Sequence, residues 1–430
     1  MESILGSKNN EEGPYTGHPG TGTQFDPWIV HDRATLLRVG TEALSPDPDD
    51  LSWHLGAHYR QVRNITLPAP EPGDSNWIPI GISNITPFTG TYNGNGRTIT
   101  GLIINTIDIN QGMFGHIDTD GIVQNLGLIN VSITAPSNVG GVAGNNLGTI
   151  QNCYVTGIIT VVNGNAGGLV GWNYSIVQYS YSTVIINGSG DDIGGLIGIN
   201  QLGTVENSYF SGTVSGDNNI GGVVGDNNSG IVQSCYARGT VSGDNNIGGV
   251  VGNNRSDISS PGTVQSCYST STVSGNSSVG GIAGQSGGLG SIIQNCYATG
   301  AVNGTTNVGG VAGTSSGNLQ NCVALNQSIS GTSNFYRIVG TNSGGLSSNY
   351  ARDIPPTDSG GSGISGGEPI ATIELFYTHA WWLSPWSANP GDGWDTSAPW
   401  FWGTIWNNAG PTRLPTLRNM PGRTQNPTAN

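Results

Sequence analysis

The 430-residue sequence has little charge: 9% of its residues are charged, against about 25% in an ordinary globular domain. Lysine occurs once, at Lys8, and the arginines are scattered without forming a run. Thirteen basic residues against 27 acidic ones give a formal net charge of −14. Nucleic acid binds through clustered positive charge, so it is a poor partner for this chain.

Long apolar segments are also missing. No stretch of 18 apolar residues occurs, and the opening MESILGSKNNEEGPYTG has neither a basic region nor an apolar core. A membrane-spanning helix needs an apolar stretch of about that length, and a signal peptide needs a basic region followed by an apolar core. We therefore expect no membrane insertion and no signal peptide in this sequence.

Glycine, in contrast, is abundant, with 71 residues. The hydrophobic residues are rich in Val and Ile and come in short runs between Gly, Asn, Ser and Thr, which is typical of many short strands. Five Gly pairs lie 27 residues apart in succession: Gly140-Gly141, Gly167-Gly168, Gly194-Gly195, Gly221-Gly222 and Gly248-Gly249. The next pair begins at Gly280, after 32 residues, and the one after it begins at Gly309, after a further 29. Insertions in turns, such as residues 255–262, explain these longer steps.

About nine copies of this unit are expected to stack as a solenoid. Each unit reads as three short strands: T-[IV]-Q-[NS]-[CS]-Y, then T-V-S, then [VI]-G-G-[LVI]-[VA]-G-x-N. Three such strands fill one coil of a three-faced parallel β-helix, and connections between parallel strands are right-handed. We therefore predict an all-β, right-handed parallel β-helix of about nine or ten coils.

Equivalent residues of successive coils should form columns along the rod. Two apolar columns would fill the core: Ile150, Val205, Val232 and Val264, and Val223, Val250, Ile282 and Val311. An amide ladder, interrupted by Glu206, would contain Gln151, Gln178, Gln233, Gln265, Gln294 and Gln320. Stacked aromatic rings, or alternatively a ligand-binding stripe, would contain Tyr154, Tyr181, Tyr209, Tyr236, Tyr268, Tyr297 and Tyr350.

The five cysteines share one further column, in which Ser180 and Ser208 fill the intervening coils. They form no CxxC metal motif, and stacked side chains point the same way, which disfavours disulfides between coils. We expect a structural ladder of buried thiols from Cys153, Cys235, Cys267, Cys296 and Cys322.

The repeated Gly-Gly-Leu-Val-Gly of residues 167–171 and Gly-Gly-Leu-Ile-Gly of residues 194–198 resemble the GLUG-motif repeats of bacterial surface proteins. Upstream segments between residues 20 and 115 are similar to those that open such solenoids. The resemblance implies an extracellular or cell-surface β-helix, as in adhesins and the noncatalytic regions of IgA-specific metallopeptidases. The zinc motif of those peptidases, H-E-x-x-H, is missing, because the segment from His54 to His58 lacks the Glu.

The two ends depart from the repeat. We expect a flexible segment over residues 1–22, an N-terminal cap with irregular coils over 23–120, regular coils over 121–352, a Gly/Ser-rich loop over 353–370 and a Trp-rich cap over 371–430. The best helix candidate is 32–39, with Asp32 as N-cap and Leu36, Leu37 and Val39 turned to the rod end. The C-terminal Trp residues would form a capping core, or a platform for sugars or another subunit: Trp381, Trp382, Trp386, Trp394, Trp400, Trp402 and Trp406.

One acidic cluster is expected on the regular coils. Asp217 and Asp244 occupy equivalent turns, with backbones about 4.8 Å apart, and Asp191 and Asp192 lie in the turn one coil earlier. Weak Ca²⁺ binding is one hypothesis, and ordinary turn chemistry is another. A polysaccharide lyase or hydrolase is a third, although no Arg lies near these residues in sequence. No other cofactor is expected.

Two noncatalytic functions follow from this reading. The rod is a cell-surface adhesin that binds glycans or surface proteins, or it is a subunit of an extracellular filament or surface assembly that contacts its own copies through the rod ends. A phage tail or receptor-binding protein and a polysaccharide-binding β-helix are alternatives. We expect no enzyme activity, and we expect any specific function at the irregular ends.

Overall fold

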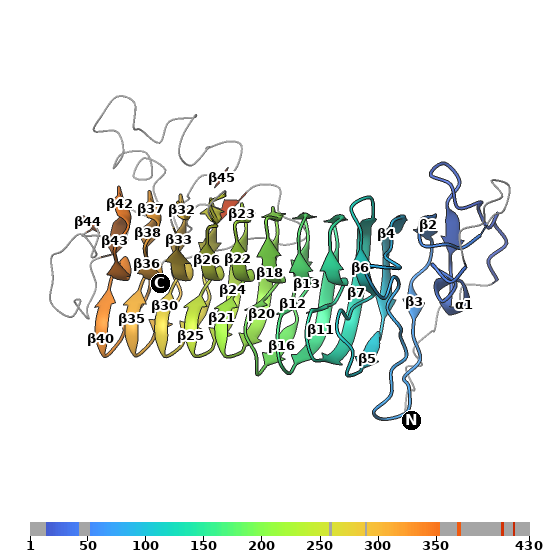
Figure 1. Ribbon diagram of the computed structural model, residues 1–430, viewed down its shortest axis with the longest axis horizontal. Coiled ribbons are helices and arrows are strands. Elements are labelled where there is room, and N and C mark those ends of the chain that lie inside the picture. The colour runs from blue at the N-terminus through green and yellow to red at the C-terminus, as the bar shows by residue number, and fades with distance from the viewer. Residues whose placement is uncertain are drawn as a thin grey trace, which may run out of the picture.

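The computed structural model describes residues 14–42, 52–257, 260–288 and 290–352, together with the backbone of 368–370, 406–407 and 416–417. These residues form a rod of stacked coils (Figure 1). About 12 turns build three parallel sheets, named A, B and C here, that run along the rod. The predicted all-β parallel β-helix is confirmed. It has more turns than predicted, because strands before residue 120 already belong to the same sheets.

Sheets B and C contain one short strand from each regular coil. Sheet C has eight strands: β8 (Val139–Gly140), β12 (Ala166–Gly167), β17 (Ile193–Gly194), β21 (Asn218–Gly221), β25 (Asn245–Gly248), β30 (Ser277–Gly280), β35 (Thr306–Gly309) and β40 (Ser333–Tyr336). Sheet B has nine: β6 (Phe114–Ile117), β9 (Ala143–Asn146), β13 (Val170–Asn173), β18 (Ile197–Gln201), β22 (Val224–Asn228), β26 (Val251–Arg255), β31 (Ala283–Gly287), β36 (Ala312–Ser315) and β41 (Val339–Asn342).

Sheet A is the largest, with 27 strands, because each coil crosses it in more than one segment. Its first strands are β1 (Trp28–Val30), β2 (His58–Gln61), β3 (Ile65–Thr66), β4 (Thr91–Thr100), β5 (Ile103–Asn105) and β7 (Ile122–Ala135). The middle strands are β10 (Thr149–Gln151), β11 (Tyr154–Val161), β14 (Ile176–Gln178), β15 (Tyr181–Ser182), β16 (Ile185–Gly188), β19 (Thr204–Glu206), β20 (Tyr209–Ser215), β23 (Ile231–Gln233) and β24 (Tyr236–Ser242). The last strands are β27 (Thr263–Gln265), β28 (Tyr268–Ser269), β29 (Thr272–Ser274), β32 (Ile292–Gln294), β33 (Tyr297–Ala298), β34 (Val302–Asn303), β37 (Asn318–Gln320), β38 (Val323–Ala324), β39 (Ile329–Ser330), β42 (Gly345–Ser347), β43 (Tyr350–Arg352) and β44 (Glu368–Ile370).

Each regular coil is divided more finely than the three predicted strands. The expected T-[IV]-Q-[NS]-[CS]-Y strand breaks in the middle, because the residue after Gln takes a left-handed conformation, as Asn152 does with φ 54° and Ser234 with φ 51°. Asn adopts this conformation at low cost, which explains its frequency at this corner. The Gly-Gly segment bends as well, so that it ends a strand of sheet C and leads into sheet B.

The glycines of the repeat permit close contact between backbones. A β-carbon added to Gly225 would lie 2.5 Å from the backbone carbonyl carbon of Asp192, where sheet B meets sheet C. One added to Gly222 would lie 2.6 Å from the side chain of Ala237 in sheet A. Side chains at these positions would push the walls of the coil apart, so the Gly pattern reflects packing across the coil.

Apolar residues at equivalent positions fill the interior. The columns that contain Val205 and Val223 are fully buried along the regular coils. Larger aromatic rings fill the first coils, where Phe88 and Phe114 lie with ring centroids 4.8 Å apart. The core is therefore continuous from the irregular first turns into the repeats.

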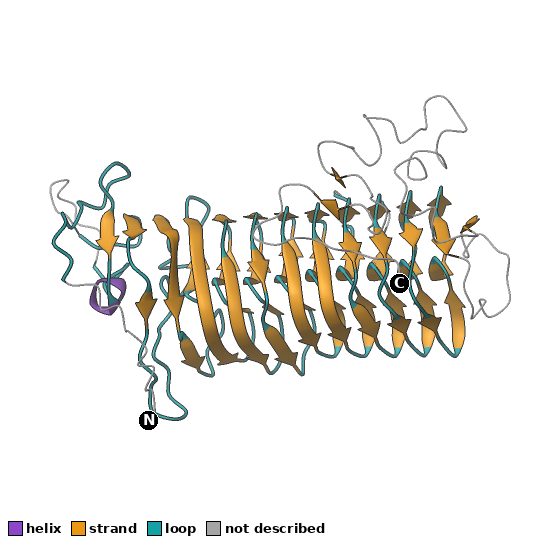
Figure 2. Cartoon of the chain, turned by 180° about the vertical axis from the view of Figure 1, so that it is seen from behind, coloured by secondary structure: helices purple, strands orange, loops and turns teal. Residues whose placement is uncertain are grey.

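The N-terminal end carries a single helical turn, α1 (Arg33–Leu36), which lies beside the first strands (Figures 1 and 2). Asp32 is its N-cap: Asp32 Oδ1 accepts a hydrogen bond from the Thr35 N–H at 2.8 Å, and the Thr35 hydroxyl accepts one from the Asp32 N–H at 3.1 Å. The helix is shorter than the predicted 32–39. Leu36 and Val39 are buried, whereas Leu37 is exposed, contrary to the prediction that all three face the rod end.

Near the C-terminal end of the chain, β45 (Trp406–Asn407) pairs antiparallel with β46 (Thr416–Leu417). Trp406 therefore lies in a strand. The other six Trp residues of the predicted platform lie outside the described residues: Trp381, Trp382, Trp386, Trp394, Trp400 and Trp402.

Candidate functional site

The Asp217 and Asp244 turns are stacked one above the other on the surface of the rod. Their backbones are joined by a hydrogen bond from the Asp244 N–H to the Asp217 carbonyl, at 2.6 Å, and both side chains are exposed. Asp191 lies in the turn one coil earlier, where its Oδ1 accepts hydrogen bonds from Asn218. Within the described ranges, no group of three or more His, Cys, Asp or Glu side chains is placed to hold a metal ion. Weak Ca²⁺ binding at this turn stays a prediction.

The cysteines lie in one buried column, and all five are free. Each thiol can donate a hydrogen bond to the carbonyl two residues earlier, as Cys296 Sγ does to Gln294 at 3.1 Å. The column also joins coils, because the Cys153 N–H donates to Ser180 Oγ at 3.0 Å. Burial raises the pKa of the Cys153 thiol to about 12, and it also raises that of Cys235.

These thiols should be unreactive in the folded protein. We expect no modification by a thiol-specific reagent such as DTNB at mildly alkaline pH, because all five sulfur atoms are buried and inaccessible to the reagent. The same sample in concentrated guanidinium chloride should release one equivalent of chromophore for each of the five cysteines. A thiol that reacted at once in the folded protein would contradict the buried column.

Two polar ladders follow sheet A. Gln side chains donate from coil to coil, as Gln265 Nε2 does to Gln233 Oε1 at 2.8 Å, and Gln233 donates in turn to Glu206 at 2.6 Å. The Tyr rings from Tyr154 to Tyr297 stack with centroids 4.8–5.0 Å apart. Tyr350 shares their register but is separated from them by Val323. Both ladders bind neighbouring coils to each other.

A third ladder, inside the rod, was not foreseen from the sequence. In five successive coils the Asn of the G-x-N segment is fully buried, and in the first four of them its Nδ2 donates to the Oδ1 of the Asn in the next coil, as Asn200 does to Asn227 at 2.8 Å. The same Nδ2 also donates to a carbonyl of the following turn, here Gly203 at 2.9 Å. The regular recurrence of Asn at this position was the signal that could have revealed it. The ladder contains Asn146, Asn173, Asn200, Asn227 and Asn254.

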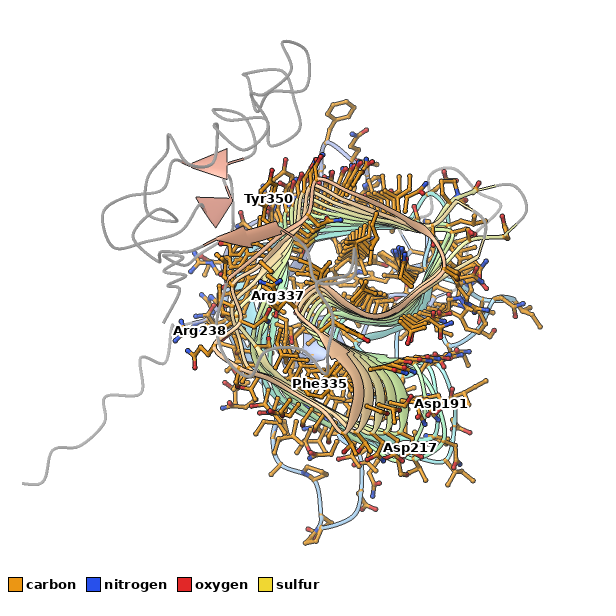
Figure 3. The ribbon with its side chains drawn as sticks, turned by 90° about the vertical axis from the view of Figure 1, so that its left-hand side faces the viewer. Asp191, Asp217, Arg238, Phe335, Arg337 and Tyr350 are labelled. Carbon is orange, nitrogen blue, oxygen red and sulfur yellow. The ribbon has the colours of Figure 1, made fainter. Side chains whose placement is uncertain are left out.

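A polar crease runs along the rod between sheets B and C, on the side of the coil that carries Asp191 and Asp217 (Figure 3). Contacts cross it from one wall to the other, such as the hydrogen bond of 2.9 Å between the hydroxyls of Ser278 and Thr314. One wall consists of residues at the start of the sheet C strands: Asn138, Asn165, Asp192, Asn219, Asn246, Ser278 and Asn307. The other consists of sheet B residues in one register: Asn145, Trp172, Ile199, Asp226, Asn253, Gln285, Thr314 and Thr341.

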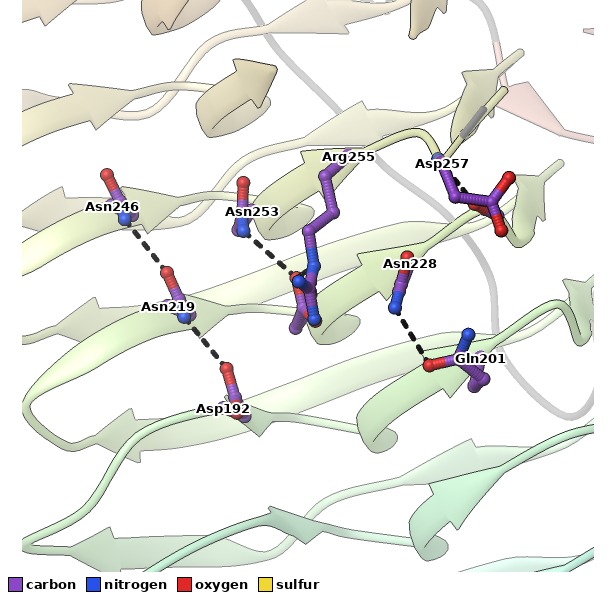
Figure 4. Close-up of polar contacts among 10 residues, drawn as sticks. Asp192, Gln201, Asn219, Asn228, Asn246, Asn253, Arg255 and Asp257 are labelled. Carbon is purple, nitrogen blue, oxygen red and sulfur yellow. Dashed lines mark hydrogen bonds and ion pairs between the residues drawn. The ribbon is translucent and has the colours of Figure 1, made fainter. Parts of the chain in front are cut away.

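The charged part of the crease is a cluster of Asp192, Asp226 and Arg255, of which Figure 4 labels Asp192 and Arg255. Asp226 is 1% exposed and forms an ion pair with Arg255, whose Nη2 lies 2.6 Å from Oδ2. Asp192 accepts a hydrogen bond from Asn219 Nδ2 at 2.8 Å. Burial, followed by the charges of Asp226 and Asp191, raises the pKa of Asp192 to about 6. Repulsion between the two carboxylates is thus an unfavourable feature of this crease.

Sequence reasoning placed Arg238 and Arg255 away from the acidic turns. Arg238 does lie on the opposite side of the rod from Asp217 (Figure 3). Arg255, however, extends from the end of β26 to the neighbouring coil and reaches Asp226. His54 and His58 do not share a helix, because His58 begins strand β2.

Comparisons with known proteins match the repeat. Three segments of the chain match the family described as the GLUG motif: residues 135–162, 189–215 and 275–303. Each matched segment covers one coil. It starts near the end of a sheet A strand, passes through sheets C and B, and ends in the next strands of sheet A. The segment 189–215, for example, begins before β17 and ends with β20.

Two relatives match part of the chain. A provisionally named Gly-rich membrane protein of Evansella cellulosilytica is 39% identical over 138 residues, and halomucin of Haloquadratum walsbyi is 33% identical over 131 residues. Each match covers 30% of this chain but only 14% and 1% of the respective relative. A solved structure from Bacteroides ovatus, provisionally assigned as an immunoglobulin A1 protease, aligns over 93% of this chain and 94% of its own, with a TM-score of 0.32 and 17% identity.

No helix among the described residues is long and apolar enough to cross a membrane. The matched segments coincide with coils whose Gly residues allow the sheets to approach closely. The chain is therefore a β-solenoid that carries GLUG-motif repeats.

Proposed function

We propose that the protein is a noncatalytic, rod-like module of a cell surface or an extracellular assembly. The observation that carries the proposal is the use of polar side chains. In the regular coils these polar side chains form ladders of hydrogen bonds that join one coil to the next, such as the buried Asn ladder with hydrogen bonds of 2.7–2.8 Å. Such ladders favour a stiff spacer, and the GLUG repeats and the partial relatives support a surface location.

Accessibility on intact cells tests this proposal. An antibody against the folded rod should label intact cells of the source organism, or the material shed by them, as strongly as permeabilised cells. A cytoplasmic protein labelled in parallel provides the control for cell integrity. Labelling that required permeabilisation would contradict a surface role.

Adhesion and assembly remain two forms of this role. Assembly would take place at the end of the rod, where β40 and β41 are the last described strands of sheets C and B. Open strand edges recruit further strands. Sedimentation of the purified chain over a wide concentration range separates the two forms: concentration-dependent polymers support a filament subunit, and a persistent monomer supports an adhesin.

A further inference from the structure

A second site lies at the N-terminal end of sheet A, away from the polar crease. A cleft of about 320 Å³ opens where the segment before β1 passes over the outer face of β2, β4 and β7. These strands form the start of the rod in Figure 1. The cleft is lined by Phe25, Arg60, His58, Asn93 and Gln124, among others. Its size is near the lower bound of about 300 Å³ for small-molecule pockets, which suits one or two sugar units.

The cleft lies where the Gln ladder of sheet A ends, and the direction of the ladder matters. Each amide Nε2 donates toward the N-terminal end, and the last such bond is from Gln151 Nε2 to Gln124 Oε1, at 2.7 Å. Gln124 Nε2 has no acceptor among the described residues. Asn93, one coil earlier in the same register, cannot supply one, because its Oδ1 already accepts bonds from the Asn95 N–H and from Asn125 Nδ2. The ladder therefore ends in free N–H donors.

Arg60 continues the same register beyond Asn93. Its side chain is exposed, and it forms no ion pair with any described residue. One guanidinium and two amide groups thus present donors in a row on an otherwise acidic chain with a net charge of −14. A row of this kind matches an anion, and the planar fork of Arg matches a carboxylate.

Two other residues favour a sugar as the carrier of that carboxylate. Phe25 is 95% exposed, although it is a large aromatic residue on the wall of a cleft. An exposed aromatic face packs against the apolar face of a pyranose ring. His58 adds a neutral group that can donate and accept, since burial and then the nearby His54 lower its pKa.

We propose that this cleft binds a carboxylate-bearing sugar, a uronic acid unit of an acidic polysaccharide. Arg60 holds the carboxylate, Gln124 and Asn93 donate to sugar oxygens, and Phe25 covers the ring. The site rests on the proposed surface role, because such polysaccharides lie outside cells. The ligand then lies at the first coils, where the end of the Gln ladder supplies the hydrogen-bond donors.

Calorimetric titration of the full chain with trigalacturonate tests the site, with neutral galactotriose as the matched ligand. We expect saturable binding of the acidic trimer and at least about ten-fold weaker binding of the neutral one, since the neutral trimer offers no carboxylate for a charge-assisted hydrogen bond with Arg60. Arg60→Gln should weaken trigalacturonate binding at least about ten-fold, and Phe25→Ala should weaken it to a similar degree. Arg97→Gln, which removes an exposed Arg of β4 outside the cleft, should leave it unchanged.

Three outcomes would overturn the site: no saturable binding of the acidic trimer, equal binding of the neutral trimer, or an equal loss on Arg97→Gln. Both Arg60 and Phe25 are exposed, so their variants should melt at the temperature of the unchanged chain, and this check separates a lost contact from a lost fold. Surface labelling of intact cells without trigalacturonate binding would overturn the site alone. Binding by a chain that is confined inside cells would overturn the surface role alone.

Discussion

Replacement of Gly225 by Ala should destabilise the rod by about 3 kcal/mol or more, the upper range for overpacking of a rigid interior. The added β-carbon would lie 2.5 Å from both the carbonyl carbon of Asp192 and the amide nitrogen of Ile193. Both are backbone atoms, so no rotation of a side chain can relieve the clash. Sheet B must move away from sheet C, and the ladders on both sides of the crease must lengthen with it.

Gly287→Ala is the matched control for this prediction. Gly287 also lies in a sheet B strand, but a β-carbon there would meet only the flexible amide of Gln285, at 3.3 Å. We expect it to change the free energy of unfolding by less than about 0.5 kcal/mol. Denaturant unfolding followed by circular dichroism compares the two variants. Equal stability of Gly225→Ala and Gly287→Ala would show that close contact between the sheets is not the reason for the third Gly of the motif.

The sequence was sufficient to predict the coil and its columns, because both are carried by periodicity. A spacing of 27 residues between Gly pairs fixes the length of a coil, and the recurrence of Val, Gln and Tyr then fixes which residues stack. A solenoid makes such inference reliable, since each coil repeats the environment of the previous one. The prediction that Cys153 and the other four cysteines share one column follows from the same periodicity.

The rest depends on features that periodicity does not carry. The left-handed corner at Asn152 divides a strand and interrupts the alternation of the side chains, because Ile150 and Cys153 are both buried although they lie three residues apart. The spacing of 27 residues gives the length of a coil but not the positions of its corners. The contact of Arg255 with Asp226 is diagonal, from one coil to the previous one, and crosses two registers. The cleft beside Phe25 lies in first coils whose long loops are unique, so no repeat indicated it.

The polar crease leads to the second large effect. Asp192→Asn should stabilise the protein at neutral pH by about 2 kcal/mol, given that each unit of pKa corresponds to about 1.4 kcal/mol and that Asp192 is partly exposed. Burial and the charge of Asp226 disfavour the ionised carboxylate. Asn removes the charge and keeps the acceptor for Asn219. Asn165 lies one coil earlier in the same register, and its Oδ1 accepts no hydrogen bond from the described residues, so donation by the new Nδ2 would make the Asn ladder of this wall continuous.

The gain should depend on pH in a defined direction. In the folded chain the pKa of Asp192 is about 6, above its ordinary value of 3.8, so the unfolded chain releases this proton first. Between these two values the original protein therefore loses stability as the pH rises, and the penalty is complete above about pH 7. Asp192→Asn should match the original protein near pH 4 and exceed it at pH 7.5.

Urea unfolding at these two pH values measures the difference in the free energy of unfolding between the variant and the original protein. Two charged groups that face Asp192, Asp226 and Arg255, are the same in both proteins. Asp217→Asn, in the equivalent turn one coil later and exposed, is the control, and we expect it to alter stability by less than about 0.5 kcal/mol at either pH. A gain for Asp192→Asn of equal size at both pH values would mean that the added ladder bond, and not the relief of charge repulsion, stabilises the variant. A loss of stability at pH 7.5 would mean that the ionised carboxylate is needed beside Arg255.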